Sequence, residues 1–222
     1  MTVHEKGLDA LESFRLARFL MHSQVYNHHA TLICEKMLQR AIEIAIRDGI
    51  IREDIFKISN PNFLNDYHSL DDSSLIQLLL KEPESKAYKL ANDLQNRCLL
   101  KRGYELNVTQ HSDAILKMKI TRMNSASQKE LEDAIAEKCN CDADLIIVKK
   151  LTTDNSLFDL RIEEGKSPIL IQMRDGSVRQ IDEISSLFRE WMPVTKFFVF
   201  CPEAYRTAVR ACTESTIRQV LT

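Results

Sequence analysis

The chain has 222 residues, with 30 lysines and arginines against 32 aspartates and glutamates, so its formal net charge at neutral pH is -2. This balance gives no basic field of the kind that attracts nucleic acid, and we expect no nucleic-acid partner. No apolar run approaches the roughly 20 residues that a transmembrane helix needs, and the first residues lack the layout of a signal peptide. We therefore expect a cytoplasmic protein with no membrane partner.

The six cysteines and five glycines argue against several common sites. The cysteines form no CxxC motif, and only Cys139 and Cys141 are close in sequence. Reduced thiols are therefore favoured over a metal or redox site. No group of glycines forms a phosphate-binding loop, which argues against a P-loop or a dinucleotide-binding fingerprint.

The first predicted element is an unusually long helix over residues 8–46. It ends before Gly49, which suits a left-handed helix cap. A kink or break at residues 26–29 stays open as an alternative, although no proline or glycine forces one there.

Arg18, His22 and Tyr26 are four residues apart on this helix and form a row along one side. Apolar residues share the same arc, so we predict that the row faces inward, next to the core. A buried guanidinium, imidazole or phenol needs polar partners, which other side chains or a ligand supply. An anionic ligand suits Arg18 best, because its planar fork matches phosphate or carboxylate.

Two shorter helices are predicted in the rest of the N-terminal part. Asp71 or Asp72 caps the first, and the second opens at Pro83 and ends in the segment from Arg97 to Lys101. The two basic residues of that segment are four apart and would share one helical face. Taken alone, they are better explained as a solvated helix end than as a phosphate contact.

The pattern becomes strand-like after Gly103. We expect one or two extended segments in residues 104–120, then a helix that a capping box at 127–130 introduces and that ends near residue 139. Strands are predicted over 145–151, 158–162, 169–173, 178–181 and 196–201, a hairpin turn over 174–177, a short helix over 182–188 and a final helix over 202–221. The sequence therefore predicts an α+β fold, with a helical region at 1–102 and an α+β lobe with a mainly antiparallel sheet at 103–222.

Several separated motifs resemble those of the HD-domain deoxynucleoside triphosphate (dNTP) triphosphohydrolases, a family of metal-dependent phosphohydrolases. In chain order they are Arg18-x3-His22-x3-Tyr26-Asn27-His28, Leu70-Asp71-Asp72-Ser73-Ser74-Leu75 and Arg97-Cys98-Leu99-Leu100-Lys101. The C-terminal region is similar to the family's C-terminal lobe in the order of its elements. The ordered series covers most of the chain and carries the resemblance.

The resemblance implies roles for particular residues. Arg18 and Tyr26 would contact the triphosphate and sugar of the substrate, and His22 would line the same pocket. The residues expected near a regulatory nucleotide, or in contact with effector phosphates, are Asn27, His28, His29, Arg97 and Lys101. The family includes a vertebrate enzyme with a sterile-alpha-motif domain, and Asn27 and His29 stand where that enzyme has glutamine and lysine.

The metal ligands of that family are not found in this sequence. The family's chemistry needs a metal held by a His…His-Asp…Asp set, and no His-Asp dipeptide occurs here. His22 and His29 would lie about 10 Å apart along a helix, too far to share one metal. We therefore predict no metal ligand and no cofactor in this chain, and a divalent metal only with an HD-bearing half. The sequence is expected to begin after the catalytic half and to be inactive alone.

Two functions from different classes follow. In the first, the chain is the substrate-facing and oligomerisation portion of an HD-type dNTP triphosphohydrolase or related nucleotide phosphohydrolase, completed by an HD-bearing partner. In the alternative, it is a self-standing protein–protein interaction or oligomerisation module with no nucleotide role. An apolar face left on the first helix also predicts a homo-oligomer. The residues expected to contribute are Leu20, Val25, Leu32 or Met37.

Overall fold

The computed structural model describes residues 2–153, 169–189 and 194–221, which fall into two compact units. Unit 1 contains Met1–His28, Glu105–Thr121 and Lys149–Phe197, and unit 2 contains His29–Tyr104, Arg122–Val148 and Phe198–Thr222. Both units are assembled from separated segments of the chain. The predicted domain boundary between residues 102 and 103 stays a prediction.

Among the described residues, two three-stranded sheets accompany the helices. One has the strand order β1-β4-β5 and the other has the order β2-β6-β3. The strands are β1 (Thr2–His4), β2 (Lys101–Asn107), β3 (Ile147–Thr153), β4 (Leu170–Gln172), β5 (Val178–Gln180) and β6 (Val194–Cys201). The predicted α+β class is confirmed. The predicted strand at 158–162 lies outside the described residues.

Unit 1 is built around helix α1 (Leu8–Met21). Strand β1 runs parallel to β4, and β4 pairs antiparallel with β5. The turn between β4 and β5 matches the prediction, because the Met173 N–H donates to the Ser177 carbonyl and Gly176 has a φ of 85°. A φ in this region favours glycine, which has no Cβ to clash.

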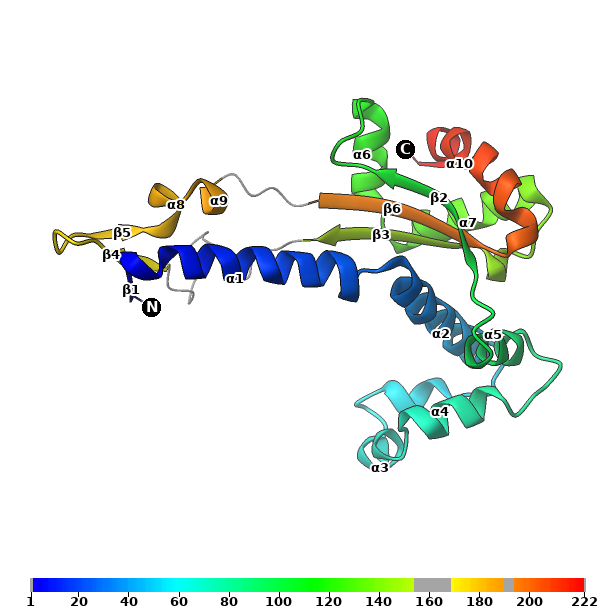
Figure 1. Ribbon diagram of the computed structural model, residues 1–222. Coiled ribbons are helices and arrows are strands. Elements are labelled where there is room, and N and C mark those ends of the chain that lie inside the picture. Colours follow the sequence, from blue (N-terminus) through cyan, green and yellow to red (C-terminus); the bar gives the residue numbers. More distant parts are fainter. Residues whose placement is uncertain (1, 154–168, 190–193, 222) are drawn as a thin grey trace. The chain divides into compact units, whose positions relative to one another are not determined.

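A small apolar core joins the N-terminal end of α1 to this sheet. Helices α8 (Ile181–Ile184) and α9 (Ser186–Arg189) take the place of the single predicted helix at 182–188. The buried residues are Ile169, Ile171, Ile181 and Phe188, and Val3, Leu8 and Leu11 pack against them. Figure 1 shows β1, β4, β5 and α8 together near the start of α1.

Unit 2 is mainly helical. Its helices are α2 (His29–Arg47), α3 (Phe63–His68), α4 (Asp72–Leu79), α5 (Lys86–Gln95), α7 (Ser125–Cys139) and α10 (Arg206–Val220). Helix α2 packs on α5, and α7 packs on α10. The buried apolar positions of α2 recur every three or four residues, as one face of a helix requires. They are Leu32, Ile33, Met37, Ala41, Ile44 and Ala45.

The described residues also form helix α6 (Ala114–Arg122) and four short 3-10 turns. The turns are Glu5–Gly7, which precedes α1, Glu53–Phe56, Ala143–Leu145 and Glu203–Tyr205. The prediction of extended structure over 104–120 is wrong for its second half. Leu116 and Ile120 are four residues apart and both buried, a helical spacing within a segment that looked loosely alternating.

Several helix boundaries follow local capping signals. Asp71 accepts a hydrogen bond from the Ser74 N–H, as the prediction of a cap there requires. Helix α2 ends before Gly49, whose φ of 74° confirms the predicted left-handed cap. Two predicted starts are wrong: Ser85, not Pro83, caps α5, and Asn124, three residues before Ser127, caps α7.

The end of α5 also differs from the prediction. The helix stops at Gln95, Arg97 takes a left-handed φ of 58°, and Lys101 begins strand β2. The Cys98 N–H donates to the Asp93 carbonyl and the Arg97 N–H donates to the Leu94 carbonyl, which is a Schellman motif. Arg97 and Lys101 therefore do not share a helical face.

No helix in the part of the chain that the structure describes combines the length and apolar character needed to cross a membrane.

Candidate functional site

The predicted long helix is interrupted where the candidate substrate residues lie. Residues His22–Tyr26 form a π-helical turn after α1, and α2 begins at His29. The Asn27 N–H donates to the His22 carbonyl at 2.8 Å, an i to i+5 bond. The break at 26–29 that the sequence left open is therefore present. Single π-helical turns are rare and occur often at functional sites.

The row of Arg18, His22 and Tyr26 does not face the core in this structure. Arg18 is exposed, Tyr26 is 53% exposed, and the His22 and Tyr26 ring centres are 5.1 Å apart. The prediction of an inward-facing row is wrong because the small core of unit 1 covers only the first turns of α1. The apolar residues beside the row are exposed with it: Phe14, Leu16, Leu20, Met21 and Val25.

The sequence missed the basic residue of α1 that does pack inward. Arg15 is only 7% exposed, and its guanidinium carbon lies 4.2 Å from the centre of the Phe188 ring. Burial lowers the pKa of Arg15. A cation over an aromatic face is stabilised by the ring quadrupole. No sequence signal pairs Arg15 with Phe188, because the two residues are far apart in the chain.

Unit 2 contains a pocket of about 290 Å³ with a strongly basic lining. Its walls are the first turn of α2, the segment that enters β2, and the first residue of α10. The lining residues are His29, Ala30, Ile33, Leu99, Leu100, Lys101, Arg102 and Arg206. We call this the basic pocket. Three cationic side chains and the N-terminal ends of two helices favour an anionic ligand there.

The basic pocket brings together two of the residues predicted to contact phosphate. His29 and Lys101 both line it, although one begins a helix and the other begins a strand. Arg97 is not among its lining residues. Asn27 and His28 belong to unit 1, at the end of the π-helical turn.

Arg102 and Arg206 were not predicted as site residues. The Lys101-Arg102 pair was a readable signal, since adjacent basic residues at the start of a strand are uncommon in a packed sheet. Arg206 had no such signal, because only the fold carries α10 to the start of α2. Its guanidinium also lies 3.6 Å from the Glu203 carboxylate, an ion pair in which both side chains are more than half exposed.

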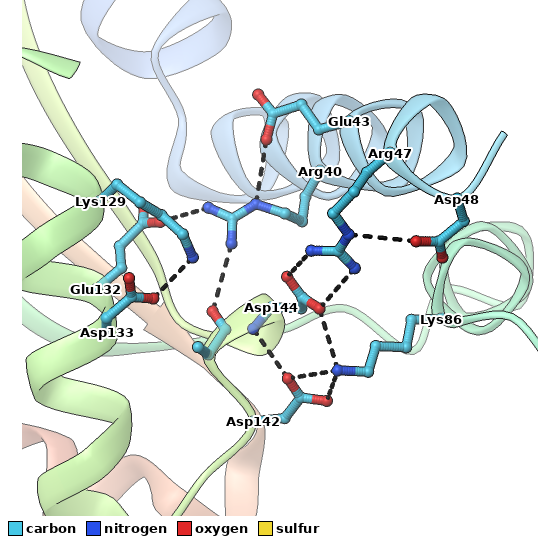
Figure 2. Close-up of polar contacts among 11 residues, drawn as sticks. Arg40, Glu43, Arg47, Asp48, Lys86, Lys129, Glu132, Asp133, Asp142 and Asp144 are labelled. Carbon is cyan, nitrogen blue, oxygen red and sulfur yellow. Dashed lines mark hydrogen bonds and ion pairs between the residues drawn. The ribbon is translucent and has the colours of Figure 1, made fainter. Parts of the chain in front are cut away.

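A second polar site in unit 2 contains a buried ion pair (Figure 2). The Arg40 guanidinium donates to the Glu132 carboxylate at 2.6 Å, and Glu132 is 1% exposed. The other Glu132 oxygen accepts from the Val148 N–H at 2.9 Å and from the Gln128 amide at 3.3 Å. The carboxylate therefore joins α2, α7 and β3. A cavity of about 390 Å³ opens beside the pair.

Asp144 is the centre of a second ion-pair cluster in Figure 2. Its carboxylate accepts two hydrogen bonds of 3.1 Å from Arg47 and one of 3.1 Å from Lys86. Lys86 also pairs with Asp142 at 2.8 Å. Burial raises the pKa of Asp144, but the hydrogen bonds and charges of Arg47 and Lys86 lower it by a larger amount. The net result is a pKa of about 2.

This low pKa predicts a loss of stability in acid. Asp144 binds its proton more weakly in the folded protein than when unfolded, so its contribution is present above about pH 4 and is lost as the pH falls towards 2. Arg47 and Lys86 are 55% and 51% exposed, and solvent screening limits the contribution to about 1–2 kcal/mol. We expect Asp144→Asn to be less stable than the parent at pH 6 and the difference to vanish near pH 2.

Urea unfolding at a series of pH values measures this difference. Asp133→Asn is the matched control, because Asp133 forms an exposed ion pair with Lys129. The control should follow the parent within about 0.5 kcal/mol at every pH. Parallel profiles for the parent and Asp144→Asn would contradict the assignment.

Among the described residues, no group of three or more His, Cys, Asp or Glu side chains is arranged to hold a metal ion.

Comparisons with known proteins agree with the fold. The chain is similar to a phosphohydrolase from Bacteroides thetaiotaomicron VPI-5482, with 19% sequence identity and a TM-score of 0.57 over 90% of this chain and 51% of that one. It is also similar to a hypothetical protein from Aquifex aeolicus, with 18% identity and a TM-score of 0.59 over 95% of this chain and 46% of that one. The chain thus spans about half the length of these structures. No curated protein matches it.

A family model described as the HD associated region matches residues 1–218, nearly the whole chain. Likeness at the identities above shows only a shared fold, whereas this match is to the sequence itself. The chain belongs to the HD-associated region family.

Proposed function

We propose that this chain is the substrate-facing and oligomerisation portion of an HD-type dNTP triphosphohydrolase or a related nucleotide phosphohydrolase. In this proposal the divalent metal and its ligands come from an HD-bearing half, and this chain alone is inactive. The family match and the likeness to a phosphohydrolase structure support an HD phosphohydrolase context.

The observation that carries the nucleotide part of the proposal is the basic pocket. A triphosphate brings several negative charges, and Lys101, Arg102 and Arg206 supply matching cations around a space of about 290 Å³. Arginine donates two parallel hydrogen bonds to a phosphate, and lysine acts as a point charge. The first turn of α2 adds the positive end of a helix. We therefore assign the effector or phosphate contacts to His29, Lys101, Arg102 and Arg206.

The substrate contact is proposed at the π-helical turn. Arg18 is exposed, so its planar guanidinium is accessible to a phosphate, to which it can donate two hydrogen bonds. The tilted pair of His22 and Tyr26 rings presents an imidazole and a phenol beside it, suited to the sugar of a nucleotide. In this proposal an HD-bearing half would complete the pocket and cover the exposed apolar residues of α1.

Nucleotide binding without hydrolysis tests this proposal. The purified chain is titrated with dGTP in the presence of Mg²⁺ or Mn²⁺, and released phosphates are measured in the same samples. We expect saturable binding of dGTP and no turnover, because the chain lacks the His-Asp metal pair. Deoxyguanosine, which has the same sugar and base without phosphates, is the control ligand and should bind far more weakly. Hydrolysis of dGTP by the chain alone would refute the proposal that the catalytic metal site belongs to an HD-bearing half.

A self-standing interaction module is the second candidate function. The exposed apolar residues of α1 favour it, since clusters of this kind usually meet a partner. Leu20 and Val25 are exposed, so self-association through them stays a prediction. Leu32 and Met37 are 2% and 1% exposed within unit 2, so including them in that surface was wrong. Failure to bind dGTP, together with concentration-dependent dimerisation in sedimentation, would favour this candidate.

A further inference from the structure

All six cysteines belong to unit 2, and four of them come from the second half of the sequence. Cys139 is the last residue of α7, Cys141 follows it, Cys201 ends β6 and Cys212 lies within α10. Cys212 is hydrogen-bonded to Cys139, and Cys141 and Cys201 contribute electrostatically to the raised pKa of Cys139. Cys201 is fully buried, whereas the other three are partly exposed.

One pair within this cluster is already in contact. The sulfur atoms of Cys139 and Cys212 are 3.5 Å apart. A disulfide requires about 2.0 Å, so the two sulfur atoms would have to approach each other by about 1.5 Å. The Cys141 thiol instead lies 3.6 Å from the Asp142 carbonyl. We propose that Cys139 and Cys212 form a reversible disulfide that joins α7 to α10 under oxidising conditions.

The reaction requires a two-electron oxidant, and we take hydrogen peroxide. One of the two sulfurs attacks one peroxide oxygen, which breaks the O–O bond and gives a sulfenic acid and one water. The other sulfur then attacks the sulfur of the sulfenic acid, forming the S–S bond, and the displaced hydroxyl leaves as a second water with the proton of the attacking thiol. Two thiols and one peroxide thus give one disulfide and two waters.

The disulfide would restrict the unfolded chain more than the folded one. The two cysteines are 73 residues apart, and a cross-link over a loop of this length removes much conformational freedom from the unfolded state. In the folded state both helices already pack against each other. We expect the oxidised chain to melt about 5–10 °C higher than the reduced chain.

Peptide mapping under non-reducing conditions tests the pairing directly. The full chain is treated with hydrogen peroxide, digested and analysed by mass spectrometry, with the melting temperature measured before and after. We expect a linked Cys139–Cys212 peptide, a rise in melting temperature and full reversal by dithiothreitol. A predominant link through Cys141, or no intrachain link, would overturn the proposal.

Matched serine variants separate this pair from general thiol oxidation. Cys212→Ser and Cys139→Ser should each lose the rise in melting temperature, while Cys98→Ser, which removes an exposed cysteine outside the cluster, should keep it. Peptide mapping of the parent chain tests the Cys139–Cys212 pairing even where a variant folds poorly. A rise that persists in both Cys139→Ser and Cys212→Ser would contradict the assignment.

Discussion

Replacing Glu132 by alanine is expected to lower the free energy of unfolding by about 3–5 kcal/mol. The substitution leaves the Arg40 guanidinium, only 8% exposed, without its closest counter-charge. It also removes the acceptor for the buried Val148 N–H. Breaking a buried ion pair costs more than the pair contributes, because the remaining charge cannot regain water. Urea unfolding of the purified chain measures the loss.

Two further variants define the cause of this loss. Glu130→Ala removes an exposed carboxylate from the same helix and should change the free energy of unfolding by no more than about 0.5 kcal/mol. Glu132→Gln keeps an acceptor for Val148 but removes the charge, and should fall between Glu132→Ala and the parent. A loss under about 1 kcal/mol for Glu132→Ala would show that the pair is not a buried anchor.

Replacing Lys101 and Arg206 together by alanine is expected to weaken tripolyphosphate binding by about 100-fold or more. Each charge-assisted hydrogen bond to phosphate contributes about 1.5–3 kcal/mol, and about 1.4 kcal/mol corresponds to a tenfold change in affinity. Folding should change little, since Lys101 is exposed and Arg206 forms only an exposed ion pair with Glu203. Isothermal titration with tripolyphosphate measures the change.

A control must remove the same amount of charge elsewhere in unit 2. Lys89 and Arg210 are exposed residues of α5 and α10 and do not line the basic pocket. Their double alanine variant should bind tripolyphosphate within about threefold of the parent at 0.15 M salt, where distant charges are screened. Equal weakening in both double variants would indicate a general charge effect and would exclude the basic pocket as the site.

Local signals in the sequence predicted a large part of the fold. Gly49, the Asp71 cap and the turn with Gly176 were all readable, because each depends on residues within one turn of the chain. The strands at 169–173, 178–181 and 196–201 were readable from apolar and β-branched runs. The helix end at Arg97 was not predicted, because a left-handed residue after a helix is normally glycine or asparagine. An arginine at this position therefore favoured a helix that continues.

The candidate site was less predictable, for a physical reason. Periodicity shows which residues share a helical face, but it does not show whether anything covers that face. The row with Arg18 shared an arc with apolar residues and was predicted to be buried, yet the small core of unit 1 ends before it. The basic pocket depends on Arg206, which long-range folding alone brings to His29.

Calorimetric titration with dGTP, comparing the parent chain with Arg18→Ala, tests the nucleotide role most directly. We expect the parent to bind dGTP and Arg18→Ala to lose about 10- to 100-fold in affinity for one class of site. Arg179→Ala, which removes an exposed arginine from the same unit, should bind like the parent. Absence of dGTP binding by the parent, or equal affinity in Arg18→Ala, would contradict the proposed nucleotide contact of Arg18.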